Sequence, residues 1–338
     1  MIDTLSRLSL LLPGAALLIA CLPAVAQEPP FVATYHGEAQ GALALTFDDG
    51  SQNQVDIAVP LLNEFGVKGT FFLVTGVIRE QASDPRLPNS SRSGNGGASW
   101  DEWRAVAAQG HEIANHSLTH ANLPRTTDPA VLDREINDSA ALITHEIGQA
   151  PLTFCYPGNG YNDAVRKLVA VHHVGDRVRC WGYGNPEFTA AQANAQVERT
   201  LAEGGELIAM IHGIEEGYMP LSREVLRQHL EYLASLDGRV WVATFADLCR
   251  YRQERESASL EVVARSAHEL SFRLTSPRDP AIFTVPLTVV IPLPGEAITA
   301  ARASYPDAPA ASLPTRVLPG RIQVDVPPGP RVVRLRWR

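Results

Sequence analysis

Apolar and polar positions follow two alternating patterns along residues 41–250. Short apolar runs such as 42–47 are typical of buried strands, and stretches such as 128–147, in which apolar residues recur three and four positions apart, are typical of helices. A strand followed by a helix, seven times over, predicts an α/β fold with a parallel sheet, open or closed into a barrel. The predicted strands are 42–47, 70–74, 111–115, 152–156, 174–178, 206–211 and 240–244, and the predicted helices are 55–65, 100–109, 128–147, 162–171, 189–203, 222–235 and 246–255.

The pattern changes after residue 255. The last 83 residues contain 12 of the 25 prolines, and their apolar and polar positions alternate as in strands. Frequent proline suits a small antiparallel sandwich with many turns and edges. We therefore predict a barrel over 27–255 and an all-β sandwich-like domain over 256–338, with strands at 260–262, 270–274, 287–291, 322–326 and 332–337.

Residues 1–26 have the pattern of a signal peptide. Arg7 precedes an apolar stretch over 8–20 that is too short for a permanent membrane span, and 24–26 (Ala-Val-Ala) offers the small residues of a signal-peptidase site. We therefore expect an exported protein, periplasmic or extracellular. Residues 18–21 also resemble a lipobox, in which case Cys21 would be lipidated and would tether the protein to a membrane.

The distribution of charge excludes one class of partner. The chain has 29 Lys and Arg against 37 Asp and Glu, a net charge of −8. A nucleic-acid-binding protein needs a basic surface, so we expect no nucleic-acid partner. Arg334, Arg336 and Arg338 nevertheless alternate onto one face of the last predicted strand. We interpret this row either as a solvated sheet edge that prevents aggregation or as a contact for an anionic polymer.

Two short motifs carry groups that can bind a metal. Asp48 and Asp49 end the first predicted strand, and His116 and His120 follow the third with a spacing that places both rings on one side of a helical turn. Taken alone, the two aspartates could be part of a turn, and the two histidines could be ordinary surface residues. Two histidines and one carboxylate, however, make an open ligand set for a catalytic divalent metal, and the second carboxylate is then available as a general base.

Further candidate residues also follow predicted strands. His212 comes directly after 206–211 and could be a general acid or a hydrogen-bonded structural residue, and Pro157 and Gly158 come directly after 152–156. In parallel barrels, the loops at the carboxyl ends of the strands form the active site. The position of all these residues after strands therefore indicates one shared site.

The motifs 46–50 (Thr-Phe-Asp-Asp-Gly), 116–120 (His-Ser-Leu-Thr-His) and 211–212 (Ile-His), in this order, resemble the polysaccharide deacetylases, the NodB-homology domain of carbohydrate esterase family four. The resemblance covers residues 41–250. It implies a distorted (β/α)7 barrel, which agrees with the seven predicted strands. It also implies a divalent metal, usually zinc, and an acetylated polysaccharide as the substrate.

The resemblance implies a role for each motif residue. The metal ligands would be Asp49, His116 and His120, the general base towards water would be Asp48, and the acid that protonates the leaving amine would be His212. Zinc would lower the pKa of its water towards about 7 and stabilise the oxyanion.

The expected substrate contacts follow from the same comparison. A backbone N–H near Gly158 would hold the acetyl oxygen, and Met210 and Ile211 would line a pocket for the acetyl methyl group. Trp181 could stack on a sugar ring or pack in the interior. The predicted substrate-binding residues are Tyr156, Pro157, Gly158, Met210 and Trp181.

The chain departs from the family pattern at Cys155. Many members have an arginine there, and that arginine orients the base. Arg177 or Arg179 could take its place. The departure affects the assignment of the subgroup and the substrate more than that of the reaction.

We expect an exported, metal-dependent deacetylase acting on N-acetyl groups of an N-acetylglucosamine-type polysaccharide. An O-acetyl esterase acting on xylan would use the same metal and base and would differ in the leaving group. Hydrolysis of a cyclic amide is a more remote alternative, which the export signal opposes. A non-catalytic carbohydrate-binding protein would need no base beside the metal, so the complete motif set argues against it.

Overall fold

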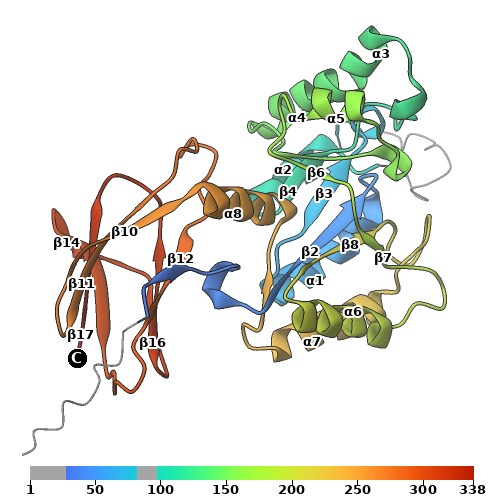
Figure 1. Ribbon diagram of the computed structural model, residues 1–338. Helices are drawn as coiled ribbons and strands as arrows, with labels where there is room; N and C mark the ends of the chain where they lie inside the picture. The colour runs from blue at the N-terminus through green and yellow to red at the C-terminus, as the bar shows by residue number, and fades with distance from the viewer. Residues whose placement is uncertain (1–27, 82–96) are drawn as a thin grey trace, which may run out of the picture.

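The computed structural model describes residues 28–81 and 97–338, so the predicted signal peptide and Cys21 lie outside the described residues. A curled parallel sheet surrounded by helices lies beside two antiparallel sheets (Figure 1). Across the parallel sheet the order is β6 (Gly175–Arg177), β5 (Thr153–Cys155), β4 (Glu112–Asn115), β3 (Thr70–Leu73), β2 (Gly41–Asp48), β8 (Glu206–Ile211) and β7 (Trp181–Gly182). The predicted α/β fold with a distorted (β/α)7 barrel is confirmed, and within the described residues the barrel is open between β6 and β7.

One strand of this path differs from the prediction. β7 is not among the predicted strands, because two residues are too short to show a hydrophobic period. The predicted strand 240–244 is instead β9 (Val240–Val242), which pairs with the start of β2 off the main path. β8 pairs along one edge of β2. On the other edge, β9 pairs with the first residues of β2 and β3 pairs with the last.

Helices connect the strands and cover the sheet (Figure 1). They are α1 (Val59–Glu64), α2 (Trp100–Ala108), α3 (Pro129–Asp133), α4 (Ser139–Ile147), α5 (Asp163–Val169), α6 (Ala190–Glu203), α7 (Arg223–Ser235) and α8 (Phe245–Ser257). A capping box in which Ser99 and Glu102 exchange hydrogen bonds begins α2. A π-helical turn at Gln54–Ala58 begins one residue before the predicted helix 55–65, and another at Arg134–Asp138 lies within the predicted helix 128–147. Within the described ranges, none of the helices has the length and apolar character of a membrane span.

The two faces of the parallel sheet are both buried. Leu43, Leu45 and Phe47 of β2 point to the outer helices and belong to the largest apolar cluster. Ala42 and Ala44 point to the concave face, where they pack with side chains of α8 such as Leu248. Because α8 fills the amino-terminal end of the concave side, the carboxyl ends of the strands are left for polar groups.

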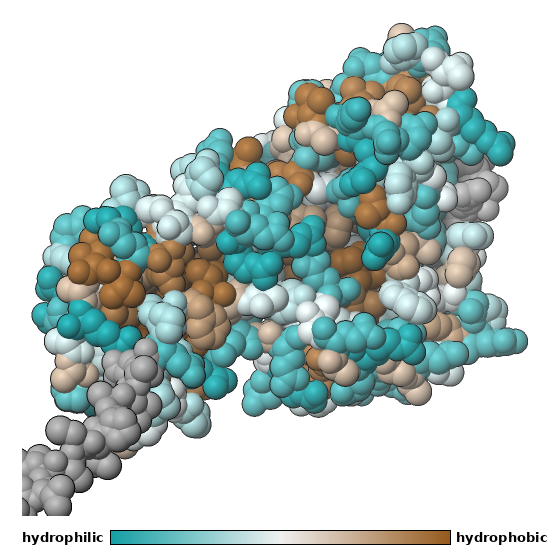
Figure 2. Space-filling model, viewed as in Figure 1, coloured by the Kyte–Doolittle hydropathy of each residue, from teal (hydrophilic) through white to brown (hydrophobic). Residues whose placement is uncertain are grey.

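The remaining strands form two antiparallel sheets that pack on each other. One consists of β1 (Phe31–Val32), β12 (Leu287–Pro292), β16 (Arg321–Val326) and β15 (Thr315–Leu318), and the other of β10 (Ser259–Arg265), β11 (Glu269–Thr275), β17 (Val332–Trp337), β13 (Ala301–Tyr305) and β14 (Ala308–Leu313). Side chains such as Phe272, Leu335 and Val324 form the apolar layer between them. Figure 2 shows hydrophobic residues in the middle of this part and hydrophilic residues along its outer margin.

The parallel-sheet region and the antiparallel part are in contact from the first described residues onward. β1 pairs with β12, so residues that precede the barrel add a strand to the antiparallel part. The hydroxyl of Tyr251 on α8 donates to the carbonyl oxygen of Ala33 at 3.0 Å, and the Tyr251 ring lies in the apolar layer of the antiparallel part. The boundary predicted at 255/256 stays a prediction.

Candidate active site

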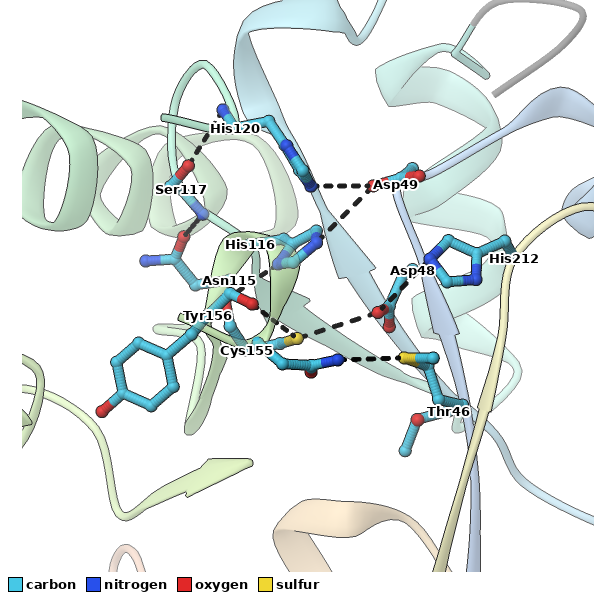
Figure 3. A network of polar contacts seen from close by, with 12 residues as sticks. Thr46, Asp48, Asp49, Asn115, His116, Ser117, His120, Cys155, Tyr156 and His212 are labelled. Carbon is cyan, nitrogen blue, oxygen red and sulfur yellow. Dashed lines mark hydrogen bonds and ion pairs between the residues drawn. The ribbon is translucent and has the colours of Figure 1, made fainter. Parts of the chain in front are cut away.

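Side chains from four strands of the parallel sheet meet at its carboxyl end (Figure 3). Asp48 ends β2 and Asp49 follows it, His116 follows β4, Cys155 ends β5 and His212 follows β8. Most of these side chains are buried. Parallel strands end at the same edge of a sheet, so residues far apart in the sequence converge there. The structure thus brings together all residues predicted as metal ligands, base and acid.

Asp49, His116 and His120 form a compact set of possible metal ligands. Asp49 Oδ1 lies 3.5 Å from His116 Nε2 and 3.6 Å from His120 Nε2. Two ligands at about 2.0–2.2 Å from one tetrahedral ion lie about 3.3–3.6 Å apart, so the spacing of these atoms fits a divalent metal. Asp49 and His120 also have positive φ angles of 76° and 61°. Such strained backbone costs of order 1–3 kcal/mol per residue and clusters at functional sites.

The surroundings of His116 hold its ring in the form that binds a metal. Nδ1 lies 2.8 Å from the carbonyl oxygen of Cys155, so Nδ1 carries the donated proton and Nε2 keeps its lone pair towards Asp49. Burial lowers the pKa of His116 to about 3, so the ring is neutral at pH 7. The backbone N–H of His120 donates to the Ser117 hydroxyl at 3.0 Å, which fixes the turn between the two histidines.

Asp48 has different partners from its neighbour in the chain. The Arg177 guanidinium donates to both carboxylate oxygens, at 2.7 Å and 2.5 Å, and to the Thr46 hydroxyl at 2.7 Å. Burial by itself would raise the pKa of Asp48, but the charge of Arg177, followed by the effects of His116 and His212, lowers it to about 2. Asp48 is therefore a fixed carboxylate that stays ionised in the neutral range.

The arginine beside Asp48 is Arg177 and not Arg179. Arg177 lies on β6 level with Cys155 on β5, so a guanidinium from the neighbouring strand reaches the carboxylate. The Cys155 thiol lies 3.8 Å from Asp48 Oδ2. Arg179 instead lines a hollow of about 500 Å³ next to Trp181. The cysteines among the described residues, Cys155, Cys180 and Cys249, are free thiols.

His212 lies on the other side of Asp48, with its Nε2 atom 4.0 Å from Asp48 Oδ2. The Tyr218 ring meets the imidazole edge-on, with ring centres 5.0 Å apart. Gln54, which the sequence analysis missed, donates from its buried amide to the carbonyl oxygens of Asp48 and His212 at 2.6 Å and 2.9 Å. One side chain therefore ties together the loops that carry the base and the acid.

Residues 37–174 match the sequence model of the polysaccharide deacetylases. This region, less than half of the chain, is similar to that family. The matched region contains Asp48, Asp49 and both motif histidines, and it ends before His212. The place of His212 in the site therefore rests on its distance from Asp48.

Three curated relatives of the chain show how much of each protein is shared. A gellan lyase from a Bacillus species is 28% identical over 297 residues, which cover 77% of this chain and 11% of that protein. A chitin deacetylase from a Pestalotiopsis species is 26% identical over 178 residues, 51% of this chain and 53% of the other. A chitooligosaccharide deacetylase from Rhizobium leguminosarum bv. trifolii is 30% identical over 159 residues, 47% and 64% of the two chains. The chain thus spans less than two thirds of each relative.

A solved structure supports the fold of the parallel sheet and its helices. The chain aligns with the crystal structure of a deacetylase-family protein from Mycobacterium smegmatis. The aligned part covers 67% of this chain and 95% of that protein, with a TM-score of 0.51 and 19% identity. At this identity the similarity concerns the fold and not the substrate.

The predicted substrate contacts on the loop after β5 differ in accessibility. Tyr156 is buried, its hydroxyl donates to Asp176 at 2.7 Å, and its ring points away from Asp48 and Asp49 (Figure 3). Its side chain belongs to an apolar cluster with Phe154 and Val165, and its role in substrate binding stays a prediction. Pro157 is buried as well. Gly158 has a φ of 60° and faces open space, so its backbone is accessible.

Met210 and Trp181 lie on the two neighbouring strands β8 and β7. Met210 is half-buried, with its Sδ atom 3.6 Å from Cys180 Sγ. Trp181 is 50% exposed, and the Arg199 guanidinium lies 6.0 Å from its ring centre. Trp181 is therefore not packed in the interior, which removes that alternative. Its role in sugar binding stays a prediction.

Proposed function

We propose that the chain is a metal-dependent deacetylase that hydrolyses N-acetyl groups of an N-acetylglucosamine-type polysaccharide. One observation carries the proposal: the adjacent carboxylates have separate partners. Asp49 lies against His116 and His120, whereas Asp48 is held by Arg177 and faces His212. A protein that only binds sugar needs no fixed base beside a metal-ligand set. The relatives named as chitin and chitooligosaccharide deacetylases support the substrate class.

Asp49, His116 and His120 would hold the metal, for which we propose zinc. Two histidines and one carboxylate suit zinc and leave coordination positions open. A divalent ion in such a set lowers the pKa of water and polarises an acyl carbonyl group.

Asp48 and His212 would move the protons of the reaction. Asp48 accepts a proton from the water whose oxygen attacks the acetyl carbon, and the two hydrogen bonds from Arg177 keep the carboxylate oriented for that step. His212, on the other side of Asp48, donates a proton to the sugar nitrogen as the C–N bond breaks. Acetate and a free amine are the products.

The substrate contacts complete the proposal. The exposed backbone at Gly158 would hold the acetyl oxygen, and Met210 would contact the acetyl methyl group. Trp181, with half of its surface exposed, would stack on a sugar ring further along the polymer. These assignments place the polymer across the carboxyl ends of the strands.

We further propose that the protein is exported and acts on its polymer outside the cytoplasm. The proposal rests on the signal-peptide pattern of residues 1–26, with a lipid tether through Cys21 as the alternative form of export. An insoluble or very long polysaccharide does not enter the cytoplasm, which agrees with an exported enzyme.

Acetate release from N-acetylglucosamine oligomers and from acetylated xylan tests the proposal. We expect the zinc-loaded protein to release acetate from the oligomers at a rate well above that from xylan, and an R179A variant to behave as the wild type. Release from xylan alone would contradict N-deacetylation and would assign the site to ester hydrolysis. Binding of the oligomers without release from either substrate would contradict catalysis.

A further inference from the structure

The last strand of the chain has an unexpected position in the antiparallel part. The alternating arginines of β17 can be explained as protection of an exposed sheet edge. β17 is, however, the middle strand of its sheet, in the order β10-β11-β17-β13-β14. It is hydrogen-bonded to β11 on one side and to β13 on the other. The edges are β10 and β14, so edge protection does not explain the arginines of β17.

Arginines from three neighbouring strands lie on the outer face of this sheet. Val333, Leu335 and Trp337 of β17 face the apolar layer, so Arg334 and Arg336 point the other way. In the register of the sheet, Arg336 lies between Arg302 of β13 and Glu269 of β11. Arg334 lies between Ser304 and Ser271, and Arg273 of β11 is level with Glu261 of β10. We call the residues Arg273, Arg302, Arg334 and Arg336 the arginine face.

The arginine face has four positive charges, and the two acidic residues that pair with it neutralise only part of this charge. Glu269 is shared by Arg336, at 2.7 Å, and Arg334, at 3.4 Å, and Glu261 pairs with Arg273 at 2.7 Å. Within the described ranges Arg302 has no acidic partner, and its Nη2 atom donates to the carbonyl oxygens of Pro309 and Ala310. Arg302 and Arg336 are therefore like charges directly opposite each other, an arrangement that destabilises a sheet.

A hollow lies at the end of the arginine face where the like charges meet. It has a volume of about 280 Å³ and is lined by Arg302, Arg336 and Arg338 together with Trp337 and two alanines. Arginine binds carboxylate groups with two parallel hydrogen bonds. An anion in this hollow would relieve the repulsion between Arg302 and Arg336.

The charge of the two regions differs in sign. Residues 256–338 contain 10 arginines against 7 acidic residues, whereas residues 27–255 contain 18 basic against 29 acidic residues. A polyanion is thus repelled by the barrel and attracted by the arginine face. The surplus of positive charge is too small for the many phosphate contacts of nucleic-acid binding.

We propose that the arginine face binds a carboxylate-bearing polysaccharide and holds it next to the deacetylase domain. The proposal rests on the proposed function, because it assigns the bound polymer to the same class as the substrate and adds that the polymer carries uronic-acid groups. Spaced carboxylates along one sugar chain match spaced guanidinium groups on a flat sheet, where each pair is weak and several act together.

Binding of the full chain to polygalacturonate tests the proposal, with carboxyl-reduced polygalacturonate, polyphosphate and phosphatidylglycerol vesicles as comparison probes. The test variant is R302Q/R336Q, which removes one like-charge pair and is therefore expected to fold, as its melting temperature verifies. The matched control is R223Q/R278Q, which makes the same change in net charge at exposed positions away from the arginine face.

We expect the wild type and the control to bind polygalacturonate equally, and the affinity of R302Q/R336Q to fall roughly tenfold. Binding should weaken with salt and should be lost on the carboxyl-reduced polymer. Equal affinity of R302Q/R336Q, equal binding of the reduced polymer, no binding of polygalacturonate, or binding of polyphosphate or vesicles alone would each overturn the proposal. Acetate release by the wild type from a neutral N-acetylglucosamine oligomer is a separate readout, and its absence would contradict the proposed function without affecting the binding result.

Discussion

The two ends of the parallel sheet each contain a carboxylate held by hydrogen bonds, buried for Asp48 and half-buried for Glu112, and the two carboxylates differ in their partners. At the amino-terminal end, Glu112 accepts hydrogen bonds from the hydroxyls of Thr70 and Thr153 and from the backbone N–H of Ala246, at 2.5–2.8 Å. At the carboxyl end, Asp48 is paired with a buried arginine. Burial raises the pKa of Glu112, whereas for Asp48 the charge of Arg177 outweighs burial and the pKa falls to about 2.

The difference in partners supports Asp48, and not Glu112, as the carboxylate that we propose for chemistry. All three partners of Glu112 are neutral groups of the fold, and one of them belongs to the first turn of α8, so Glu112 fastens that helix under the sheet. Asp48 has charged partners and lies next to a metal-ligand set. Burial alone does not mark a catalytic carboxylate, because the identity of its partners decides between stability and catalysis. The following variants test this comparison.

The largest effect is expected for D49A. The variant loses the carboxylate that the two histidines face, so zinc binding and acetate release should both fall to undetectable levels. Zinc per chain by elemental analysis and acetate release from N-acetylglucosamine oligomers measure the two effects. An exposed-site control, D133A, should keep both. Stoichiometric zinc in D49A would contradict the ligand assignment.

D48N should separate chemistry from metal binding. The amide keeps the shape of the side chain but cannot accept a proton, so turnover should fall about 10²–10⁴-fold while zinc stays bound. Kinetics on the same oligomers, with zinc content measured on the same preparation, check the expectation. Turnover close to the wild-type value would exclude Asp48 as the base.

R177M should affect stability and activity together. The variant leaves Asp48 buried without its cation, which should lower the free energy of unfolding by about 3–5 kcal/mol. The double variant R177M/D48N removes the unpaired charge, so it should recover part of that loss in urea unfolding. R179A should match the wild type in both assays. A stability loss in R177M that D48N does not reduce would show that Arg177 acts by packing and not through Asp48.

E112Q should change stability without changing the site. One carboxylate oxygen becomes an amide group that cannot accept the existing hydrogen bonds, so the free energy of unfolding should fall by about 1–3 kcal/mol. Acetate release by the folded variant should equal that of the wild type. Lost turnover in a folded E112Q would contradict the division of roles between the two ends.

The pH dependence of unfolding adds a second test at Glu112. Its pKa in the folded state is above the ordinary value of 4.5, so the folded state binds the proton more tightly than the unfolded chain. The contribution to stability is therefore present below pH 4.5 and is lost as the pH rises through the raised pKa. E112Q lacks this group, so the difference in unfolding free energy between the two proteins should shrink as the pH rises above 4.5.

The smallest effect is expected for W181A. A ring that stacks on sugar contributes about 0.5–1.5 kcal/mol, so KM for long N-acetylglucosamine polymers should rise about two- to tenfold. The kcat value for a short oligomer should stay the same. An unchanged KM for polymers of every length would remove Trp181 from the substrate path.

Much of the fold and the candidate site can be predicted from the sequence because the relevant signals are local. The seven predicted strands and the Asp48-Asp49 and His116–His120 motifs are each short stretches of the sequence. Placing the motifs at strand ends is enough to predict that they meet, since parallel strands end at one edge. The metal set and the neighbouring base therefore follow from short stretches of sequence.

The features that sequence analysis misses depend on contacts between distant segments. Gln54 binds the backbone of two loops, and nothing in its own segment distinguishes it from an exposed polar residue. The short strand β7 depends on pairing with β8. Tyr156 follows a strand, as the site residues do, but its hydroxyl donates a hydrogen bond to Asp176 and its ring is buried. The central position of β17 depends on strand order, which alternation does not reveal.

The most direct test of the account is a zinc titration of chelator-stripped protein with acetate release from an N-acetylglucosamine oligomer as the readout. The account predicts no release without metal, a rate that rises with bound zinc and saturates at one zinc per chain, and no recovery in a variant in which His120 is replaced by alanine. Full acetate release by the stripped protein, or saturation of the metal site with no release at all, would contradict it.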